Sequence, residues 1–442
     1  MFQLKVDKIK SIVDSKWYSS IMLLCIYGYT FFSIGIHNIG NIFLGFIILG
    51  SIPVLILNKK KLLQDPIVIL FLFVILIQIV SWVNSTLFFT EYANNIPKVD
   101  RLGKLFVFFF IAFWLQGNIK NILNLWIIFI FGYLLAICIH ADYNNVLIAI
   151  SNDIRVDFSI KNSQFDSMLA GVSFLMLLFF PMLVIKNYNK LFKNLLYKYS
   201  LYILISFMMI LFLEIILITE SRQVWLGLVI SLFIGFCIYI VLYKVKNMKL
   251  IFSLFIGLSL SIYMLKSSEI VQDRLLKEKD VINSIVSSNK PIEMTSIGIR
   301  INSWIEASSW IQKHPIVGLD SVAIGQVIEQ SDKFTKELKH QFGHLHNFFI
   351  ETLVAYGIVG LVLMLLLYYL VLKSIIKSNI RDEDKRYFLL LGSVFIVYWL
   401  VINNFETYNS RWLGVFTNNI ILGTLYTFYL NSSLKEEKKS LE

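Results

Sequence analysis

Two histidines stand close together where a long apolar run begins. They belong to the segment Gly343-His344-Leu345-His346-Asn347, in a chain that has only six histidines. An imidazole with its ordinary pKa of about 6.5 can take a proton from a hydroxyl group near neutral pH, so the segment indicates a general base. On a helix, a spacing of two residues would direct the imidazoles to different faces. No aspartate or cysteine cluster completes a ligand set either, so we expect no metal site.

Two arginines accompany the histidines, each in a polar segment bordered by apolar residues. Arg222 follows Thr219-Glu220-Ser221, and Arg300 precedes Trp304 by one helical turn. Each has a structural alternative, Arg222 as a snorkelling cation at a span end and Arg300 as a solvated cation on a surface helix. A guanidinium group also offers a planar fork of donors that fits phosphate oxygens. Two such cations and a base suit a diphosphate substrate: the cations stabilise the departing diphosphate while the base deprotonates an incoming hydroxyl, without a metal ion.

The composition places these residues in a membrane protein. Of the 442 residues, 57% are hydrophobic and only 16% are charged, too few for a surface in water. The formal net charge of +11 would suit nucleic acid, but the lysines and arginines lie in short clusters between apolar runs. Membrane topology explains them, and we expect no nucleic acid partner. Cys25, Cys138 and Cys237 lie within apolar stretches and indicate neither a disulfide framework nor a redox centre.

Apolar runs of the length that crosses a bilayer recur along the whole chain. Twelve can be drawn, of which the fourth and the ninth are short. We therefore predict an all-α polytopic membrane protein with about twelve transmembrane helices in the lipid bilayer. The predicted spans are Trp17–Ile36, Ile39–Leu57, Ile67–Val83, Leu102–Leu115, Ile122–Ile139, Met168–Ile185, Leu201–Ile218, Val224–Tyr243, Leu250–Leu265, Asn347–Leu372, Tyr387–Ile402 and Trp412–Leu430.

The lysines and arginines assign a side of the membrane to each connection, because cytoplasmic loops collect positive charge. One alternate set of connections is rich in these residues, at 59–61, 186–198, 244–249 and 373–386, and we predict that it is cytoplasmic together with both termini. The opposite set holds few cations and is predicted to face outward. Those outward cations include Lys98, Arg101, Arg155, Lys161, Arg222 and Arg411.

One outward connection, residues 266–346, is much longer than the others and must fold on the membrane surface. It divides the chain into an N-terminal transmembrane bundle at 1–265, this large outer loop, and C-terminal transmembrane helices with a tail at 347–442. Within the loop, Thr295 or Ser296 is a candidate N-cap and Pro315 follows the expected end of a helix. Apolar residues between them predict an amphipathic helix lying at the interface, with two tryptophan anchors. These residues are Ile301, Trp304, Ile305 and Ile311, with Trp304 and Trp310 as the anchors.

The order of these motifs resembles the O-antigen ligase family. The resemblance lies in Ser221-Arg222 with Trp225, Arg300 with Trp304, His314-Pro315-Ile316-Val317-Gly318, and His344-Leu345-His346-Asn347 followed by Tyr356-Gly357-Ile358-Val359-Gly360. It covers roughly residues 214–372 and implies a membrane-embedded, GT-C-like glycosyltransferase that works without metal or another cofactor. The implied place of action is the periplasmic face of the bacterial inner membrane. The implied donor is a glycan on undecaprenyl diphosphate, and the implied acceptor is a sugar hydroxyl of the lipid A core oligosaccharide.

The resemblance also implies roles for single residues. Arg222 and Arg300 match the arginines that bind the diphosphate. The His-x-His-Asn segment holds the catalytic base, for which we favour His346, next to Asn347, and keep His344 as the second choice. The remaining candidates for the substrate site are Asn347, Glu220 and Glu351, the two glutamates as groups that orient an arginine or the histidine.

Other activities compete with that of a ligase. O-antigen polymerases and protein O-oligosaccharyltransferases belong to the same superfamily and differ chiefly in the acceptor. The length of the chain favours ligase or polymerase over the protein-directed enzymes, and the His-Asn motif favours ligase over polymerase. A transporter or lipid flippase is the alternative from a different class. It predicts ionisable residues near mid-membrane or paired helix breaks, for which Glu214 and Pro181 are the main candidates.

Overall fold

The computed structural model describes residues 10–13, 15–152, 154–188, 191–245 and 292–441, which form helices and loops without a strand. Within these ranges, nine helices are long and apolar enough to cross a membrane, which confirms a polytopic all-α membrane protein. The count of twelve spans and the division into three parts stay predictions, and the run Leu250–Leu265 lies outside the described residues. The nine helices are α2 (Lys16–Gly35), α3 (His37–Leu57), α5 (Pro66–Phe88), α8 (Ile119–His140), α10 (Ser163–Asn187), α11 (Leu195–Ile218), α12 (Arg222–Tyr243), α19 (Phe348–Lys377) and α20 (Asp382–Asn403).

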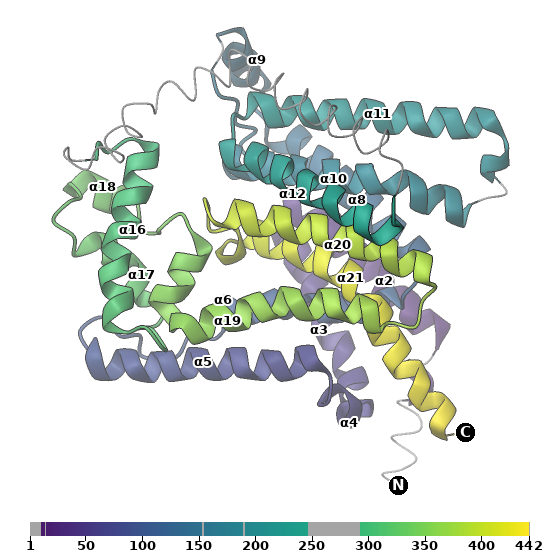
Figure 1. Ribbon diagram of the computed structural model, residues 1–442, viewed down its shortest axis with the longest axis horizontal. Helices are drawn as coiled ribbons and strands as arrows, with labels where there is room; N and C mark the ends of the chain where they lie inside the picture. Colours follow the sequence, from purple (N-terminus) through teal and green to yellow (C-terminus); the bar gives the residue numbers. More distant parts are fainter. Residues whose placement is uncertain (1–9, 14, 153, 189–190, 246–291, 442) are drawn as a thin grey trace.

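The other described elements are mostly short helices in the connections. They are α4 (Lys59–Leu62), α6 (Asp100–Gly103), η1 (Lys104–Phe106), α7 (Phe108–Leu115), α9 (Tyr143–Ser151), η2 (Leu191–Lys193), α16 (Ser296–Lys313), α17 (Val322–Glu329), α18 (Lys336–Gln341), η3 (Tyr408–Ser410) and α21 (Trp412–Leu441). Several of the long helices, among them α5, α11, α19 and α20, run roughly along one direction, horizontal in Figure 1. The helices α16, α17 and α18 gather at one end of the bundle, which we call the loop end (Figure 1).

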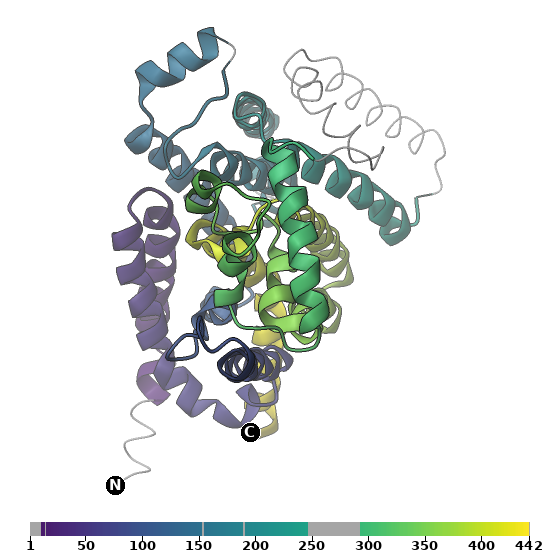
Figure 2. The same cartoon turned by 90° about the vertical axis from the view of Figure 1, so that its left-hand side faces the viewer.

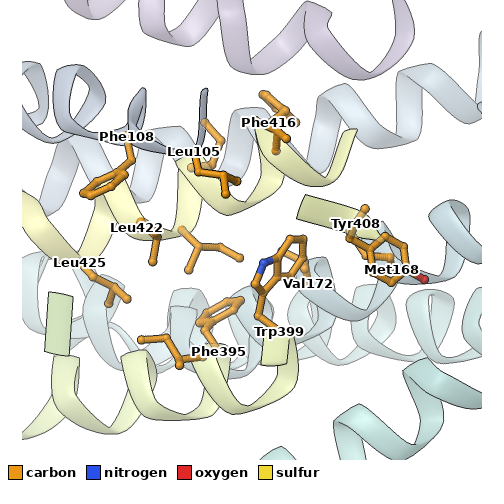
Figure 3. Close-up of a cluster of buried hydrophobic side chains, with 14 of the residues drawn as sticks. Leu105, Phe108, Met168, Val172, Phe395, Trp399, Tyr408, Phe416, Leu422 and Leu425 are labelled. Atoms are coloured by element: carbon orange, nitrogen blue, oxygen red, sulfur yellow. The ribbon is translucent and has the colours of Figure 1, made fainter. Parts of the chain in front are cut away.

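Two further predicted spans are helical and buried inside the bundle. The predicted run Trp412–Leu430 is part of α21, and the short fourth run is a broken helix made of α6, η1 and α7. Figure 3 shows the apolar cluster in which both of them meet α20 and α10; it includes Leu105, Phe108, Phe416, Leu422, Leu425, Trp399 and Val172. A helix surrounded by protein need not be as apolar as one that faces lipid. The buried threonines and asparagines of α21 are consistent with this position: Thr417, Asn418, Asn419, Thr424 and Thr427.

Asn419 explains how the fourth run can be broken within the bundle. Its side-chain oxygen accepts the N–H of Phe108 at 2.8 Å, and its side-chain nitrogen donates to the carbonyl of Lys104 at 2.9 Å. Unpaired peptide groups in an apolar interior cost several kcal/mol, roughly, so a helix break persists there only where another group replaces the lost bonds. The side-chain amide of Asn419 replaces the lost hydrogen bonds at the junction of η1 and α7.

A second break lies in α19, at Gly357, whose φ of 61° is outside the helical region. The turn formed by residues 315–320 lies against this break. The N–H of Ile358 donates to the carbonyl of Pro315 at 2.8 Å, and the N–H of Asp320 donates to the carbonyl of Ala355 at 2.9 Å. A Cβ atom on Gly357 would lie 2.2 Å from the carbonyl oxygen of Ile316, so only glycine permits this approach. The Pro-x-x-Gly and Gly-x-x-Gly motifs are therefore two halves of one contact.

Two residues in the C-terminal part of α5 are hydrogen-bonded to this contact. The hydroxyl of Ser81 donates to the carbonyl of Ala355 and accepts the N–H of Asp320 at 2.7 Å. The side-chain amide of Asn84 donates to the carbonyl of Gly318 at 2.7 Å. Helices α5 and α19 and the loop end are thus joined by hydrogen bonds between buried or partly buried groups.

Helix α16 has the predicted limits. Thr295 caps it by accepting the N–H of Gly298 at 3.3 Å, and it ends before Pro315, as the sequence predicted. Its most buried residues include Arg300 and Ser303, whereas Ile305 is exposed. The interfacial position of α16 and the anchoring role of Trp304 stay predictions; the ring nitrogen of Trp304 donates to the carbonyl of Leu345 at 2.7 Å. Figure 2 shows α16 crossing in front of the bundle at the loop end.

Candidate functional site

The two histidines of the motif converge on one carboxyl group. The segment 342–347 is a loop and not a helix, so the expectation that the imidazoles point to different faces is wrong. Their ring centroids are 4.0 Å apart. Nδ1 of His346 lies 3.1 Å from Oε2 of Glu406, and Nε2 of His344 lies 3.5 Å from Oε1 of the same residue. The nitrogen and oxygen atoms of the three residues lie within 4.8 Å of one another, a spacing at which a cation could be held.

Glu406 is the residue that sequence reasoning missed. It lies in the short connection between α20 and α21, and its side chain is only 5% exposed. Burial by itself raises the pKa of Glu406, but hydrogen bonds from both histidines and their positive charge outweigh burial and hold that pKa well below its usual value. The carboxyl group is therefore ionised and can only accept hydrogen bonds, which requires that Nδ1 of His346 carry the hydrogen. Nε2 of His346 is then the nitrogen that can accept a proton.

His346 adopts a backbone conformation that is uncommon for residues other than glycine. Its φ is 50°, in the left-handed region, which costs roughly 1 kcal/mol or more in a residue with a Cβ atom. Burial lowers the pKa of its imidazole, the bond to Glu406 raises it, and the charges of His344 and Arg300 lower it again; the net direction is downward. The left-handed backbone conformation of His346 persists only where the surrounding structure imposes it, and backbone strain of this kind is common at functional sites.

Leu345, between the two histidines, is held from both sides. Its carbonyl accepts the ring N–H of Trp304 at 2.7 Å, and its own N–H donates to Oε1 of Glu351 at 3.0 Å. The other oxygen of Glu351 accepts a hydrogen bond from Arg101, which also donates to the hydroxyl of Ser410 at 3.0 Å. Glu351 therefore orients the histidine loop through its backbone.

Arg300 lies beside the histidines, within electrostatic range of His346 and of the buried Tyr408, and its own side chain is largely buried. Of the predicted arginines, this one is brought to the histidine cluster. Arg222 begins α12, one residue before Gln223, whose amide donates to the hydroxyl of Tyr408 at 3.2 Å. Arg222 and Glu220 each have an interaction of their own within the protein.

Asn347 has a structural role that the sequence motif did not reveal. Its side-chain oxygen accepts the N–H groups of Phe349 and Ile350, both at 3.0 Å, and so caps the first turn of α19. The histidine loop thus ends in a fixed helix start, which positions His346 directly before the cap.

Other cations of the predicted outward loops gather around the same place. Arg155 donates from Nε to the carbonyl of Thr219 at 2.8 Å and lies within electrostatic range of Tyr408. Desolvation and the neighbouring Arg411 lower the pKa of Lys161 to about 8, while Glu406 opposes this shift. Cations from separate connections thus surround one histidine–carboxylate cluster, as expected of a site for an anionic ligand.

A family model described as O-antigen ligase matches residues 207–365. This segment is similar to the O-antigen ligase family. The match runs from α11 into α19 and contains every residue that the sequence motifs singled out, from Glu220 to Glu351. Glu406 and Arg101 lie outside residues 207–365, so residues from other parts of the chain also contribute to the histidine cluster and its supports.

One relative adds to this finding. A curated protein of Haemophilus influenzae, described as an uncharacterized protein, is 26% identical over 203 residues, which make up 44% of this chain and 49% of the relative. The chain therefore matches about half the length of that relative.

Proposed function

We propose that this protein is an O-antigen ligase that transfers a glycan from undecaprenyl diphosphate to a sugar hydroxyl of the lipid A core oligosaccharide. The proposed reaction takes place at the periplasmic face of the bacterial inner membrane, with both termini of the chain in the cytoplasm. The observation that carries the proposal is His346, with Nδ1 bonded to a buried carboxylate and Arg300 beside it. A base and a permanent cation meet there, as displacement of a diphosphate requires.

The proposed mechanism is a single displacement. Nε2 of His346 takes the proton of the acceptor hydroxyl as its oxygen attacks the anomeric carbon of the donor glycan. The bond between that carbon and the diphosphate oxygen breaks, and the electron pair leaves with the polyprenyl diphosphate. Arg300 and Arg222 stabilise the negative charge that the diphosphate gains. Glu406 fixes the tautomer of His346 and stabilises the imidazolium that forms.

This mechanism uses no metal ion. The spacing of His344, His346 and Glu406 would suit a divalent cation, so an experiment must test whether the reaction needs one. The proposal rests on charge: the guanidinium groups compensate the diphosphate directly, and a cation at the three residues would occupy the nitrogen or the carboxylate that base catalysis needs. Asn347, Glu220 and Glu351 are proposed to support the substrate site by positioning other groups.

The alternatives differ in acceptor or in class. An O-antigen polymerase or a protein O-oligosaccharyltransferase would use the same base and cations with another acceptor. A transporter or flippase requires ionisable groups facing an internal pathway. Glu214 is exposed on α11, whereas Arg155, Lys161 and Arg300 lie near the histidine–carboxylate cluster. This placement favours an enzyme.

Deletion of the gene distinguishes the activities. We expect lipopolysaccharide from the deletion strain to lack all glycan-capped chains on a gel, because no other step attaches the glycan. Cores that keep a single repeat unit would identify a polymerase instead.

The purified protein should transfer glycan equally well with and without a chelator, because the proposed mechanism uses no metal ion. Inhibition that added divalent ion reverses would contradict the metal-free mechanism.

Exchanging Arg300 for lysine should reduce turnover about tenfold or more, because a point charge cannot bind two phosphate oxygens as a planar fork does. The measurement is kcat of the purified variant with the lipid-linked donor, alongside Arg222→Lys. Arg381→Lys serves as the matched control, since this exposed arginine pairs with Asp384 in the α19–α20 connection. Near-normal turnover of Arg300→Lys would identify Arg300 as a structural anchor.

A further inference from the structure

An apolar cavity of about 240 Å³ lies between α3, α5 and the broken helix α6–η1–α7. Every side chain that lines it is apolar, and phenylalanines predominate; the lining includes Leu55, Ile67, Phe71, Gly103, Phe106 and Phe110. Several of these residues are only partly buried, so the cavity reaches the surface of the bundle. Such a lining offers nothing to a sugar or a phosphate, and it suits a hydrocarbon chain.

The cavity extends along α5 toward the histidine loop. Ile67 and Phe71 belong to the first turns of α5, whereas Gly103 lies beside Ile75, about 12 Å further along the helix axis from Ile67. The N–H of Leu102 donates to the side chain of Gln78 at 3.1 Å, which continues the same direction. The broken helix thus leads from the cavity toward Arg101.

Charged groups stand where the cavity ends. Arg101, two residues before Gly103, bonds to Glu351, and that carboxyl group also holds the N–H of Leu345 between the two histidines. Lys104, directly after Gly103, lies within electrostatic range of Arg101 and Arg411. An apolar cavity with a group of cations at the end nearest the site matches a lipid whose anionic head adjoins its tail.

We infer that this cavity binds part of the isoprenoid tail of the polyprenyl diphosphate donor, with the diphosphate at the cations beside the histidine loop. This inference rests on the proposed function and adds a binding site for the lipid part of the substrate. Between lipid and protein the gain comes from van der Waals contact and shape, because the tail is in apolar surroundings in either place. The methyl branches of an isoprenoid pack against the phenylalanine rings of the lining.

The test compares two donors that carry the same glycan, one on the undecaprenyl chain and one on a ten-carbon chain. Val107→Trp and Val68→Trp place a large side chain in the cavity from its partly buried rim. We expect KM for the long-chain donor to rise roughly tenfold and KM for the short-chain donor to stay unchanged. Ile69→Trp is the matched control, since Ile69 is 40% exposed on α5 and does not line the cavity.

Equal KM changes with both donors, or none with either, would overturn the inference. No transfer by the unmodified protein from either donor would contradict the proposed function itself. A second readout does not depend on turnover: with a photoreactive benzoylphenylalanine in place of Val107, light should attach the polyprenyl diphosphate donor to the protein in membranes without acceptor. Attachment of phospholipid alone would show that the cavity holds an ordinary membrane lipid.

Discussion

Replacing His346 with alanine is expected to lower kcat for glycan transfer about a thousandfold while the protein still inserts into the membrane. The loss follows from removal of the only proposed proton acceptor for the incoming hydroxyl. The measurement is single-turnover transfer by the purified variant, with membrane yield measured in parallel. His340→Ala is the matched control, because His340 is exposed on α18.

The companion variant His344→Ala assigns the base. His344 is 23% exposed and lies 3.5 Å from Glu406, compared with 12% and 3.1 Å for His346, so its loss should cost much less. If His346→Ala keeps transfer and His344→Ala loses it, the role moves to His344. If both variants keep transfer, the motif does not supply the base.

Exchange of Glu406 for glutamine is expected to lower the plateau of kcat about a hundredfold, since the amide no longer stabilises an imidazolium. The pH profile should also shift. In the intact protein the carboxylate raises the pKa of His346 against the effect of burial, so without it that pKa falls further. The rise of the rate with pH, which reports loss of the proton from the base, should therefore move to lower pH.

The two readouts separate catalysis from folding. A merely structural glutamate would lower yield or stability without moving the pH profile. Glu329→Gln, at an exposed position of α17, is the control for removal of one charge. An unchanged plateau and an unchanged pH midpoint in Glu406→Gln would refute a positioning role for Glu406.

The sequence predicted the helical membrane fold because hydrophobic length is a local property. It also predicted, from the order of motifs that each look weak alone, that Arg222, Arg300 and the histidine motif lie together; the structure brings Arg300 to the histidines. Glu406 escaped prediction because a single glutamate in a short loop carries no local sign of its partners. The two histidines that bond to it come from another part of the chain, and only their packing against Glu406 makes it a buried ion.

The errors have the same physical origin. The imidazoles were expected to diverge because the segment was treated as helical, whereas the cap at Asn347 starts α19 one residue after His346. The hydrogen bond from the ring nitrogen of Trp304 to the carbonyl of Leu345 was not predicted, because the two residues are 41 positions apart in the sequence. The break of the fourth run depends on Asn419, more than 300 residues later in the chain.

The hydrogen bonds that join α5 to the break in α19 affect the order in which the protein folds. Ser81 and Ala355, which share a hydrogen bond there, are 274 positions apart in the sequence. Contacts of such long range form late, because the loop between them must close first. Newly synthesised protein should therefore pass through a stage in which early spans are inserted but α19 is still loose, and in which no catalysis takes place. The histidine loop acquires its geometry only when translation has supplied the last helices.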